Sequence, residues 1–110
     1  MFRLIKHKLF GRNMEYYDVN ILELKEKQKK GAMIIDVRSS QEYLEGHLKE
    51  AINIPYYEIN KNVNNILKDK NKEIVLYCQS GERSLQAYKK LIKLQYKNVY
   101  NLYRGIDNWL

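Results

Sequence analysis

Two continuous apolar runs constrain the fold of this chain of 110 residues more than any other feature. Residues 32–37 read Ala-Met-Ile-Ile-Asp-Val, and residues 73–77 read Glu-Ile-Val-Leu-Tyr. Runs rich in β-branched residues and without polar alternation are typical of strands that are covered on both faces, as in parallel sheets. Helical patterns separate the two runs, so the sequence predicts an α/β fold with a largely parallel sheet.

Weaker patterns fill the chain around these runs. Further strands are expected at residues 15–19, 51–54 and 99–102. Helices are expected at residues 21–30, 42–45, 56–67 and 84–94, with a last helical turn at 106–110. Asn20 and Glu23 have the spacing of a capping box in front of the first helix. Strands that alternate with helices in this way favour one layered domain.

The net charge of +7 raises the question of nucleic-acid binding. Residues 1–14 contain four basic residues and no acidic residue before position 15, and the other 96 residues carry 16 basic and 13 acidic side chains in mixed order. A nucleic-acid interface usually shows a basic stripe with interleaved aromatic residues, which this sequence lacks. We therefore expect no nucleic-acid partner.

Residues 1–14 are a basic, loosely amphipathic segment, whereas residues 15–110 contain the α/β pattern. We expect residues 1–14 to form an extension that packs on the domain or frays. A second interpretation is a short helix that contacts a membrane surface or a partner. The segment lacks the features of a signal peptide, and no run in the chain approaches the roughly 20 apolar residues of a membrane span.

The loop that follows the second apolar run carries the candidate chemistry. It reads Cys-Gln-Ser-Gly-Glu-Arg-Ser at residues 78–84 and leads into the helix expected at 84–94. Backbone N–H groups at such a strand-to-helix turn converge at the positive end of the helix dipole, which favours an anion such as the nucleophilic thiolate. Cys78 is the only cysteine, so an internal disulfide is excluded and a reducing cytoplasm is the expected location. Arg83 adds a cation with five hydrogen-bond donors.

Four motifs in this order resemble the single-domain rhodaneses, a family of sulfurtransferases. They read Ile-Asp-Val-Arg at residues 35–38, Glu-Gly-His-Leu at 45–48 with Ala-Ile-Asn-Ile-Pro at 51–55, the loop at 78–84, and Gly-Ile-Asp-Asn-Trp at 105–109. The resemblance covers the chain from about Tyr16 to the C-terminus. It implies a three-layer fold with a mostly parallel sheet of about five strands and helices on both faces.

The resemblance also implies a reaction. Cys78 would take a sulfane sulfur from thiosulfate or a persulfide and pass it to a thiol or to cyanide. The backbone N–H groups of the loop would stabilise the thiolate and the persulfide, and they belong to Gln79, Ser80, Gly81, Glu82 and Arg83. Ser84 completes the loop. The related cell-cycle phosphatases have one more residue between cysteine and arginine, so the six-residue span from Cys78 to Arg83 favours a single sulfur over phosphate.

The lone cysteine has a further consequence. No second cysteine is available to resolve the persulfide, so an external thiol such as glutathione, thioredoxin or a protein thiol is expected as the acceptor. No metal or organic cofactor is implied, because His7 and His47 have no cysteine or acidic cluster at ligand spacing. A different class of function, a binding or sensing module without significant turnover, remains open at this point.

Other residues of the motifs are expected to support the structure. Asp36 and Arg38 are interpreted as structural, with Arg38 pairing to Glu42 or Glu45, and His47 as a hydrogen-bonded structural residue.

Glu82 places an acid beside the loop, which would weaken the binding of thiosulfate through like-charge repulsion. Arg104 and Gly105 stand where the family usually has two glycines, which leaves the shape of that turn open.

Overall fold

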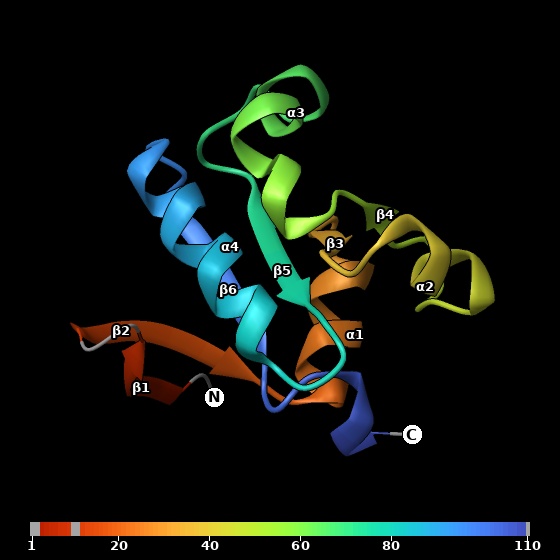
Figure 1. Cartoon of the computed structure of the whole chain (residues 1–110), viewed down its shortest axis with the longest axis horizontal. Coiled ribbons are helices and arrows are strands. Elements are labelled where there is room, and N and C mark those ends of the chain that lie inside the picture. The colour runs from red at the N-terminus through yellow and green to blue at the C-terminus, as the bar shows by residue number, and fades with distance from the viewer. Residues whose placement is uncertain (1–2, 10–11, 110) are drawn as a thin grey trace.

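The structure is a computed structural model that describes the backbone of residues 3–9 and 12–109 and the side chains of residues 16–109. A single six-stranded sheet has the order β1-β2-β6-β5-β3-β4 (Figure 1). Its strands are β1 (Arg3–Leu9), β2 (Arg12–Val19), β3 (Met33–Asp36), β4 (Ile52–Asn53), β5 (Glu73–Tyr77) and β6 (Asn98–Leu102). The five strands from β2 to β4 run parallel, which confirms the predicted α/β sheet.

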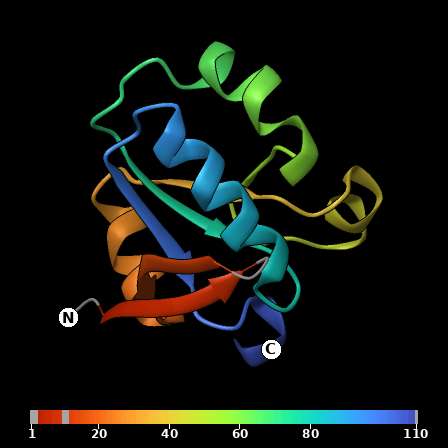
Figure 2. The same ribbon diagram turned by 60° about the vertical axis from the view of Figure 1, so that its left-hand side comes forward.

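Helices cover both faces of the sheet, as expected. They are α1 (Ile21–Lys29), α2 (Ser40–Glu45), α3 (Ile59–Ile66) and α4 (Glu82–Lys93), with 3₁₀ turns η1 (Tyr56–Glu58) and η2 (Ile106–Trp109). Figure 2 shows α3 and α4 in front of the sheet and α1 behind it. The capping box predicted at Asn20 is present, with 2.8 Å hydrogen bonds in both directions between Asn20 and Glu23. The structure contains no helix long and apolar enough to cross a membrane among the described residues.

The N-terminal segment forms a strand that the sequence analysis did not predict. Residues 3–9 form β1, which pairs antiparallel with β2 from Arg3 opposite Asp18 to Leu9 opposite Arg12. The helical interpretation of this segment is therefore wrong for residues 3–9, and the strand expected at residues 15–19 begins at Arg12. The boundary placed after residue 14 falls inside β2. The cause is pairing between these two neighbouring strands: each strand supplies the hydrogen-bond partners of the other, which the pattern of either segment alone does not reveal.

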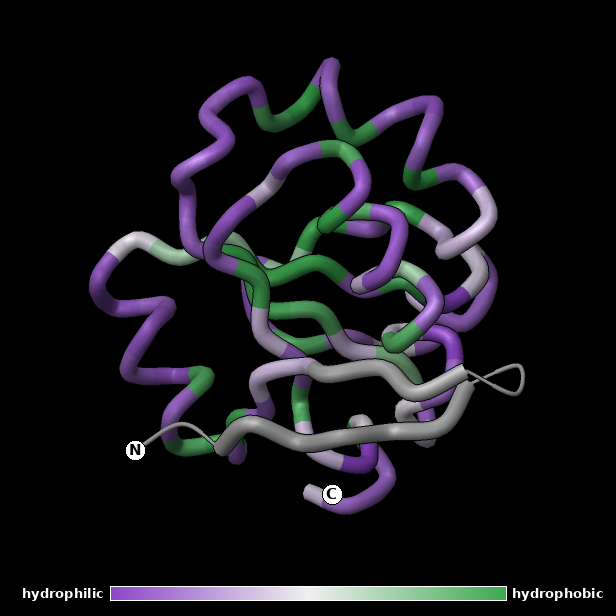
Figure 3. The backbone as a smooth tube through the Cα atoms, turned by 90° about the vertical axis from the view of Figure 1, so that its left-hand side faces the viewer, coloured by the Kyte–Doolittle hydropathy of each residue, from purple (hydrophilic) through white to green (hydrophobic). Residues whose placement is uncertain are grey.

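The core lies on both faces of the central strands. Ile35 and Leu76 face the cluster under α3 and α4, whereas Ile34 and Val75 face the cluster under α1 and η2, and all four are buried. Figure 3 shows this distribution, with hydrophobic residues along the central strands and hydrophilic residues along the outer helices and turns. Continuous apolar strands are required because successive side chains point to opposite faces.

The carboxyl ends of β3 and β5 meet at one edge of the sheet. Asp36 is the register partner of Tyr77, and the Val37 N–H donates to the Tyr77 carbonyl oxygen at 3.0 Å. Each strand then turns into the N-terminus of a helix, α2 after β3 and α4 after β5. Ligand sites in parallel sheets gather at this edge. The segments that follow Asp36 and Tyr77 therefore form the candidate site.

Candidate active site

Cys78 follows β5 directly and is buried, with 0% of its surface exposed. Two backbone donors reach its sulfur: the Gly81 N–H at 3.1 Å and the Ser84 N–H at 3.3 Å. The Gly81 donor was among those expected from the loop, whereas Ser84 was expected in the loop but not as a backbone donor. Both N–H groups lie at the N-terminus of α4, where the helix dipole favours a negative charge on the sulfur.

The sulfur takes the place of a helix cap. Gly81 is the N-cap residue of α4 and has no side chain that could accept the N–H of the third helical residue, Ser84. In most helices a Ser, Thr, Asp or Asn side chain at the N-cap accepts this hydrogen bond. Here Cys78 accepts it from three residues before the N-cap. Gly81 has a φ of +111°, a conformation that side chains disfavour, so glycine is required at the point where the loop turns into the helix.

The hydroxyl of Ser84 links the thiol to β6. It lies 3.5 Å from the sulfur of Cys78, 2.9 Å from the carbonyl oxygen of Gly81 and 2.5 Å from Oδ1 of Asn101. Ser84 and Asn101 are both buried. A buried polar side chain needs such partners, because an unsatisfied group would cost about 1–3 kcal/mol. Asn101 is a residue of this network that the sequence did not indicate, since it lies in β6, 17 positions from Ser84.

The start of η2 and the turn before it contact the backbone of the cysteine loop. The N–H groups of Ile106 and Asp107 donate to the carbonyl oxygens of Cys78 and Gln79 at 2.9 and 3.0 Å. A Cβ atom at Gly105 would lie 2.6 Å from each of these two oxygens, so only glycine allows the approach. The neighbouring Arg104, which occupies the place of a second glycine, has a φ of +57°. The turn therefore keeps a left-handed conformation at both positions, which answers the question that the sequence left open.

The β3 side of the site holds a buried ionic network. The carboxylate of Asp36 accepts hydrogen bonds from the Arg38 guanidinium at 2.7–3.1 Å, from the Arg38 N–H at 2.9 Å and from the Tyr77 hydroxyl at 2.7 Å. The hydrogen bond to Asp36 raises the pKa of Arg38 above its usual value. Burial, followed by the hydrogen bond to Asp36, raises the pKa of Tyr77. Tyr77 and Arg38 therefore remain protonated.

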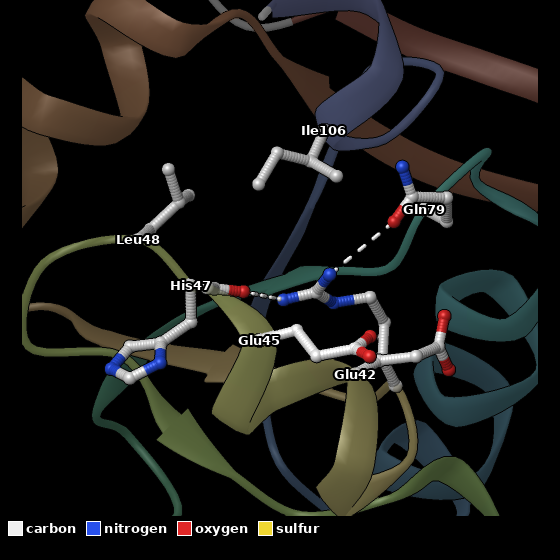
Figure 4. A pocket seen from close by; sticks show the side chains of 8 residues that line it. Glu42, Glu45, His47, Leu48, Gln79 and Ile106 are labelled. Carbon is white, nitrogen blue, oxygen red and sulfur yellow. Dashed lines mark hydrogen bonds between the residues drawn. The ribbon is translucent and has the colours of Figure 1, made fainter.

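Arg38 does not pair with Glu42 or Glu45, so that prediction is wrong. Its Nη2 reaches the carbonyl oxygen of Gly46 at 2.6 Å, and its Nη1 reaches Oε1 of Gln79 at 3.3 Å (Figure 4). Asp36 lies two residues before Arg38 in the same turn and is buried beside it, so the pair forms without ordering a second segment. Arg38 thereby connects the end of β3 to both α2 and the loop.

The carboxylate of Glu42 belongs to a different arginine. Arg83 forms a bidentate ion pair with it, with Nη1 to Oε1 at 2.6 Å and Nη2 to Oε2 at 3.0 Å. Their hydrogen bond lowers the pKa of Glu42 from 4.5 to about 2 and raises the pKa of Arg83. Both side chains are about one third exposed, at 32% and 30%. The pair joins α2 to the first turn of α4 at the surface of the site.

A cavity of about 440 Å³ opens between α2, the loop and η2. Its lining comprises Arg38, Glu42, Glu45, Gly46, His47, Leu48, Gln79 and Ile106. Figure 4 shows Leu48 and Ile106 on one side and the acidic side chains of Glu42 and Glu45 on the other. His47 is exposed, stacks on Tyr43 with ring centroids 3.7 Å apart, and its Nδ1 lies 2.8 Å from the Tyr43 carbonyl oxygen. The expected hydrogen bond of His47 is therefore present, and its structural role stays a prediction.

The remaining loop residues point to two sides. Gln79 lines the 440 Å³ cavity and donates from Nε2 to Asp107. Ser80, Gly81 and Glu82 line a smaller hollow of about 220 Å³ on the other side of the loop, together with Arg104. The loop thus separates two hollows and covers the sulfur of Cys78 between them.

The comparison with known proteins agrees with this geometry. The family model of the rhodanese-like domain matches residues 20–110. A sulfurtransferase of Allochromatium vinosum is 35% identical over 77 residues, which cover 70% of either chain. A probable molybdopterin-synthase adenylyltransferase of Porphyra purpurea is 33% identical over 110 residues, which cover 96% of this chain but only 28% of that protein. The domain thus occurs both in short proteins and within longer ones.

Solved structures confirm the fold. The human single-domain sulfurtransferase TSTD1 superposes with a TM-score of 0.74 at 28% sequence identity, covering 84% of this chain and 93% of that one. On its sequence, its fold and the loop that presents Cys78, this chain belongs to the rhodanese-like domain family.

Proposed function

We propose that this protein is a sulfurtransferase in which Cys78 carries the transferred sulfur as a persulfide. One observation carries the proposal: the sulfur of Cys78 accepts the N–H groups of Gly81 and Ser84 at the N-terminus of α4. These donors favour the thiolate, which is the nucleophilic form of cysteine. The family relationship and the names of its relatives support the same chemistry.

The proposed reaction has two steps, loading of Cys78 and transfer of the sulfur to an acceptor. The Cys78 thiolate attacks the outer sulfur of a donor, a bond forms between these two sulfurs, and the donor's own bond to that sulfur breaks. The leaving group keeps the electron pair and departs as sulfite from thiosulfate, or as a thiolate from a persulfide. In the second step an acceptor thiolate or cyanide attacks the outer sulfur of the Cys78 persulfide, and the Cys78 thiolate is released.

The acceptor in this proposal comes from outside the chain, because the protein has one cysteine. Glutathione, thioredoxin or another protein thiol would fill this role, and a reducing compartment such as the cytoplasm suits a free reactive thiol. Because Cys78 is 0% exposed, loading requires some of the residues around it to move. The small ring of donors fits one added sulfur better than a phosphate with its four oxygens.

Intact-mass spectrometry after incubation with a sulfane donor tests the proposal. We expect the protein to gain the mass of one sulfur with thiosulfate or with cysteine persulfide, and to lose it on addition of cyanide. The Cys78→Ser variant, which keeps the size of the side chain, should gain nothing. If the wild-type protein gains no sulfur from either donor, sulfur transfer is wrong and a binding module becomes the better interpretation.

A further inference from the structure

We infer that Glu42 is a specificity-determining residue that selects thiol persulfides over thiosulfate as sulfur donors. The inference rests on the proposed function and concerns the entrance of the same site. Thiosulfate carries two negative charges, so a site that uses it efficiently needs a cation free to bind its sulfonate oxygens. Around the loop, the cationic side chains of the described residues instead form ion pairs or lie near an acidic side chain.

Arg83 is the first of these cations. Both of its terminal nitrogens are taken by the carboxylate of Glu42, at 2.6 and 3.0 Å. A guanidinium and a carboxylate in this parallel arrangement satisfy each other and cancel their charges. The depressed pKa of Glu42, about 2, means that the carboxylate stays charged at neutral pH. Arg83 therefore offers an incoming anion little net charge.

Arg38 is the second cation, and its charge is balanced by Asp36. The two side chains are 7% and 0% exposed and lie 2.7 Å apart at their closest atoms. The remaining guanidinium contacts go to the carbonyl oxygen of Gly46 and to Gln79. Since Asp36 balances Arg38 and Arg83 balances Glu42, Glu45 carries the remaining acidic charge along the cavity wall. Without Arg83 as a free counter-charge, this wall repels a dianion.

The hollow on the other side of the loop gives no better entrance for thiosulfate. Its lining includes one acid, Glu82, and one guanidinium, Arg104. Their charges balance, and the hollow holds about 220 Å³ against 440 Å³ for the cavity beside Glu42. Glu82 is exposed at the first position of α4, whereas Glu42 directly holds the arginine of the loop. Glu42 therefore has the larger effect on the choice of donor.

A thiol persulfide suits this entrance. It carries at most one charge on its transferable sulfur, and its organic part can contact the apolar wall formed by Leu48 and Ile106. A donor with an ammonium group would also be attracted by the carboxylate of Glu45 on the acidic side of the cavity. In the transfer step the Cys78 thiolate bonds to the outer sulfur, the donor's S–S bond breaks, and a thiolate leaves in place of sulfite.

The test measures rate constants of Cys78 loading by rapid quench and intact-mass spectrometry, with thiosulfate and freshly prepared cysteine persulfide. In Glu42→Gln the side chain can still close the capping box with Ser39, but Arg83 loses its counter-charge. We expect the ratio of the thiosulfate rate to the persulfide rate to rise about tenfold, a typical electrostatic effect on association. The increase should shrink as salt is added.

Four further variants make the result specific. Glu42→Asp keeps the charge and should keep the wild-type ratio, and Glu42→Gln combined with Arg83→Gln should lose the increase. Glu26→Gln removes an acid from the exposed face of α1 and controls for net charge. Glu82→Gln tests the competing acid of the loop.

The outcomes separate the two proposals. If the wild-type protein loads from neither donor, the proposed function fails. If the wild-type protein loads, but the ratio is the same in Glu42→Gln, or rises only in Glu82→Gln, the role of Glu42 is wrong while sulfur transfer stands. A wild-type protein that already loads faster from thiosulfate than from cysteine persulfide would also overturn the inference.

Discussion

Two strand-turn-helix units lie side by side at the carboxyl edge of the sheet, and the N-termini of their helices are capped differently. After β3, Ser39 caps α2: its hydroxyl accepts the Glu42 N–H at 3.2 Å, and the Glu42 carboxylate accepts the Ser39 N–H at 3.1 Å. After β5, the N-cap of α4 is Gly81, and the acceptor at the same helical position is the sulfur of Cys78. The first helix is capped by its own capping box, whereas the second is capped by the sulfur of Cys78.

The two units also differ in the charge of the groups that they bury. The unit after β3 buries an ion pair, Asp36 with Arg38, and the unit after β5 surrounds its thiol with neutral donors. Arg83, the one cation within the loop, is held by Glu42 from the first unit. One unit therefore supplies buried ionic contacts and the partner of Arg83, and the other places Cys78 at the N-terminus of α4. Substitutions in the two units should affect different properties.

The largest change in stability is expected in the unit after β3. Asp36→Ala leaves the buried guanidinium of Arg38 without its counter-charge and should cost about 3–5 kcal/mol of unfolding free energy. Urea unfolding followed by circular dichroism measures this loss. The double variant Asp36→Ala with Arg38→Met removes both charges and should be more stable than Asp36→Ala alone. Equal stability of the two variants would show that the ion pair is not the cause.

Substitution of Gly105, where the turn before η2 contacts the cysteine loop, should have an intermediate effect on stability. A Cβ at Gly105 would lie 2.6 Å from the carbonyl oxygens of Cys78 and Gln79, so Gly105→Ala must push the loop away from η2. Overpacking of this kind costs about 1–3 kcal/mol. Sulfur loading of Cys78 should fall as well, because the loop that caps α4 is displaced.

Arg104→Gly is the matched control for this substitution. It changes the adjacent residue, whose φ of +57° glycine adopts without strain, so stability should not fall by a comparable amount. Thermal unfolding and intact-mass loading measured on both variants check the comparison. A Gly105→Ala protein with wild-type stability and loading would mean that the close approach does not support the loop.

The ion pair between Glu42 and Arg83, which joins the two units, should make the smallest contribution to stability. This contribution should depend on pH. The pKa of Glu42 is lowered from 4.5 to about 2, so its contribution to stability is complete above pH 4.5 and is lost as the pH falls towards 2. The pair is partly exposed, which limits the contribution to about 1 kcal/mol. Urea midpoints of the wild-type protein and Glu42→Gln should differ at pH 6 and converge at pH 2. A difference that does not change with pH would exclude this role of the ion pair.

Most of the parallel sheet was predictable from sequence, and β1 was not. The apolar runs that became β3 and β5 are nearly continuous, because both of their faces are buried, and this pattern is local. The segment 3–9 carries no comparable pattern, and its strand depends on pairing with β2. The helix that begins after Asn20 was predictable to within one residue because its capping box lies within four consecutive positions.

The site was predictable in part, for the same reason. The cysteine loop is a contiguous motif, so its residues and its place before α4 follow from the chain itself. Its partners come from distant positions: Asn101 reaches Ser84 from β6, and Glu42 reaches Arg83 across 41 positions. Glu42 and Glu45 lie near Arg38 in the sequence and suggested the wrong ion pair. The sequence does not reveal that the Arg38 side chain instead contacts the buried carboxylate of Asp36.

By itself, the sequence determined the α/β layering, the strand-loop-helix that carries Cys78, and the presence of a single cysteine. These properties depend on local hydrophobic pattern, on caps and turns, and on composition. Only the tertiary structure decided that the thiol is covered, that it caps α4, and that Glu42 pairs with Arg83. Those properties depend on which side chains meet when the ends of β3 and β5 are brought to one edge of the sheet, and that meeting is a consequence of the packing of the whole domain.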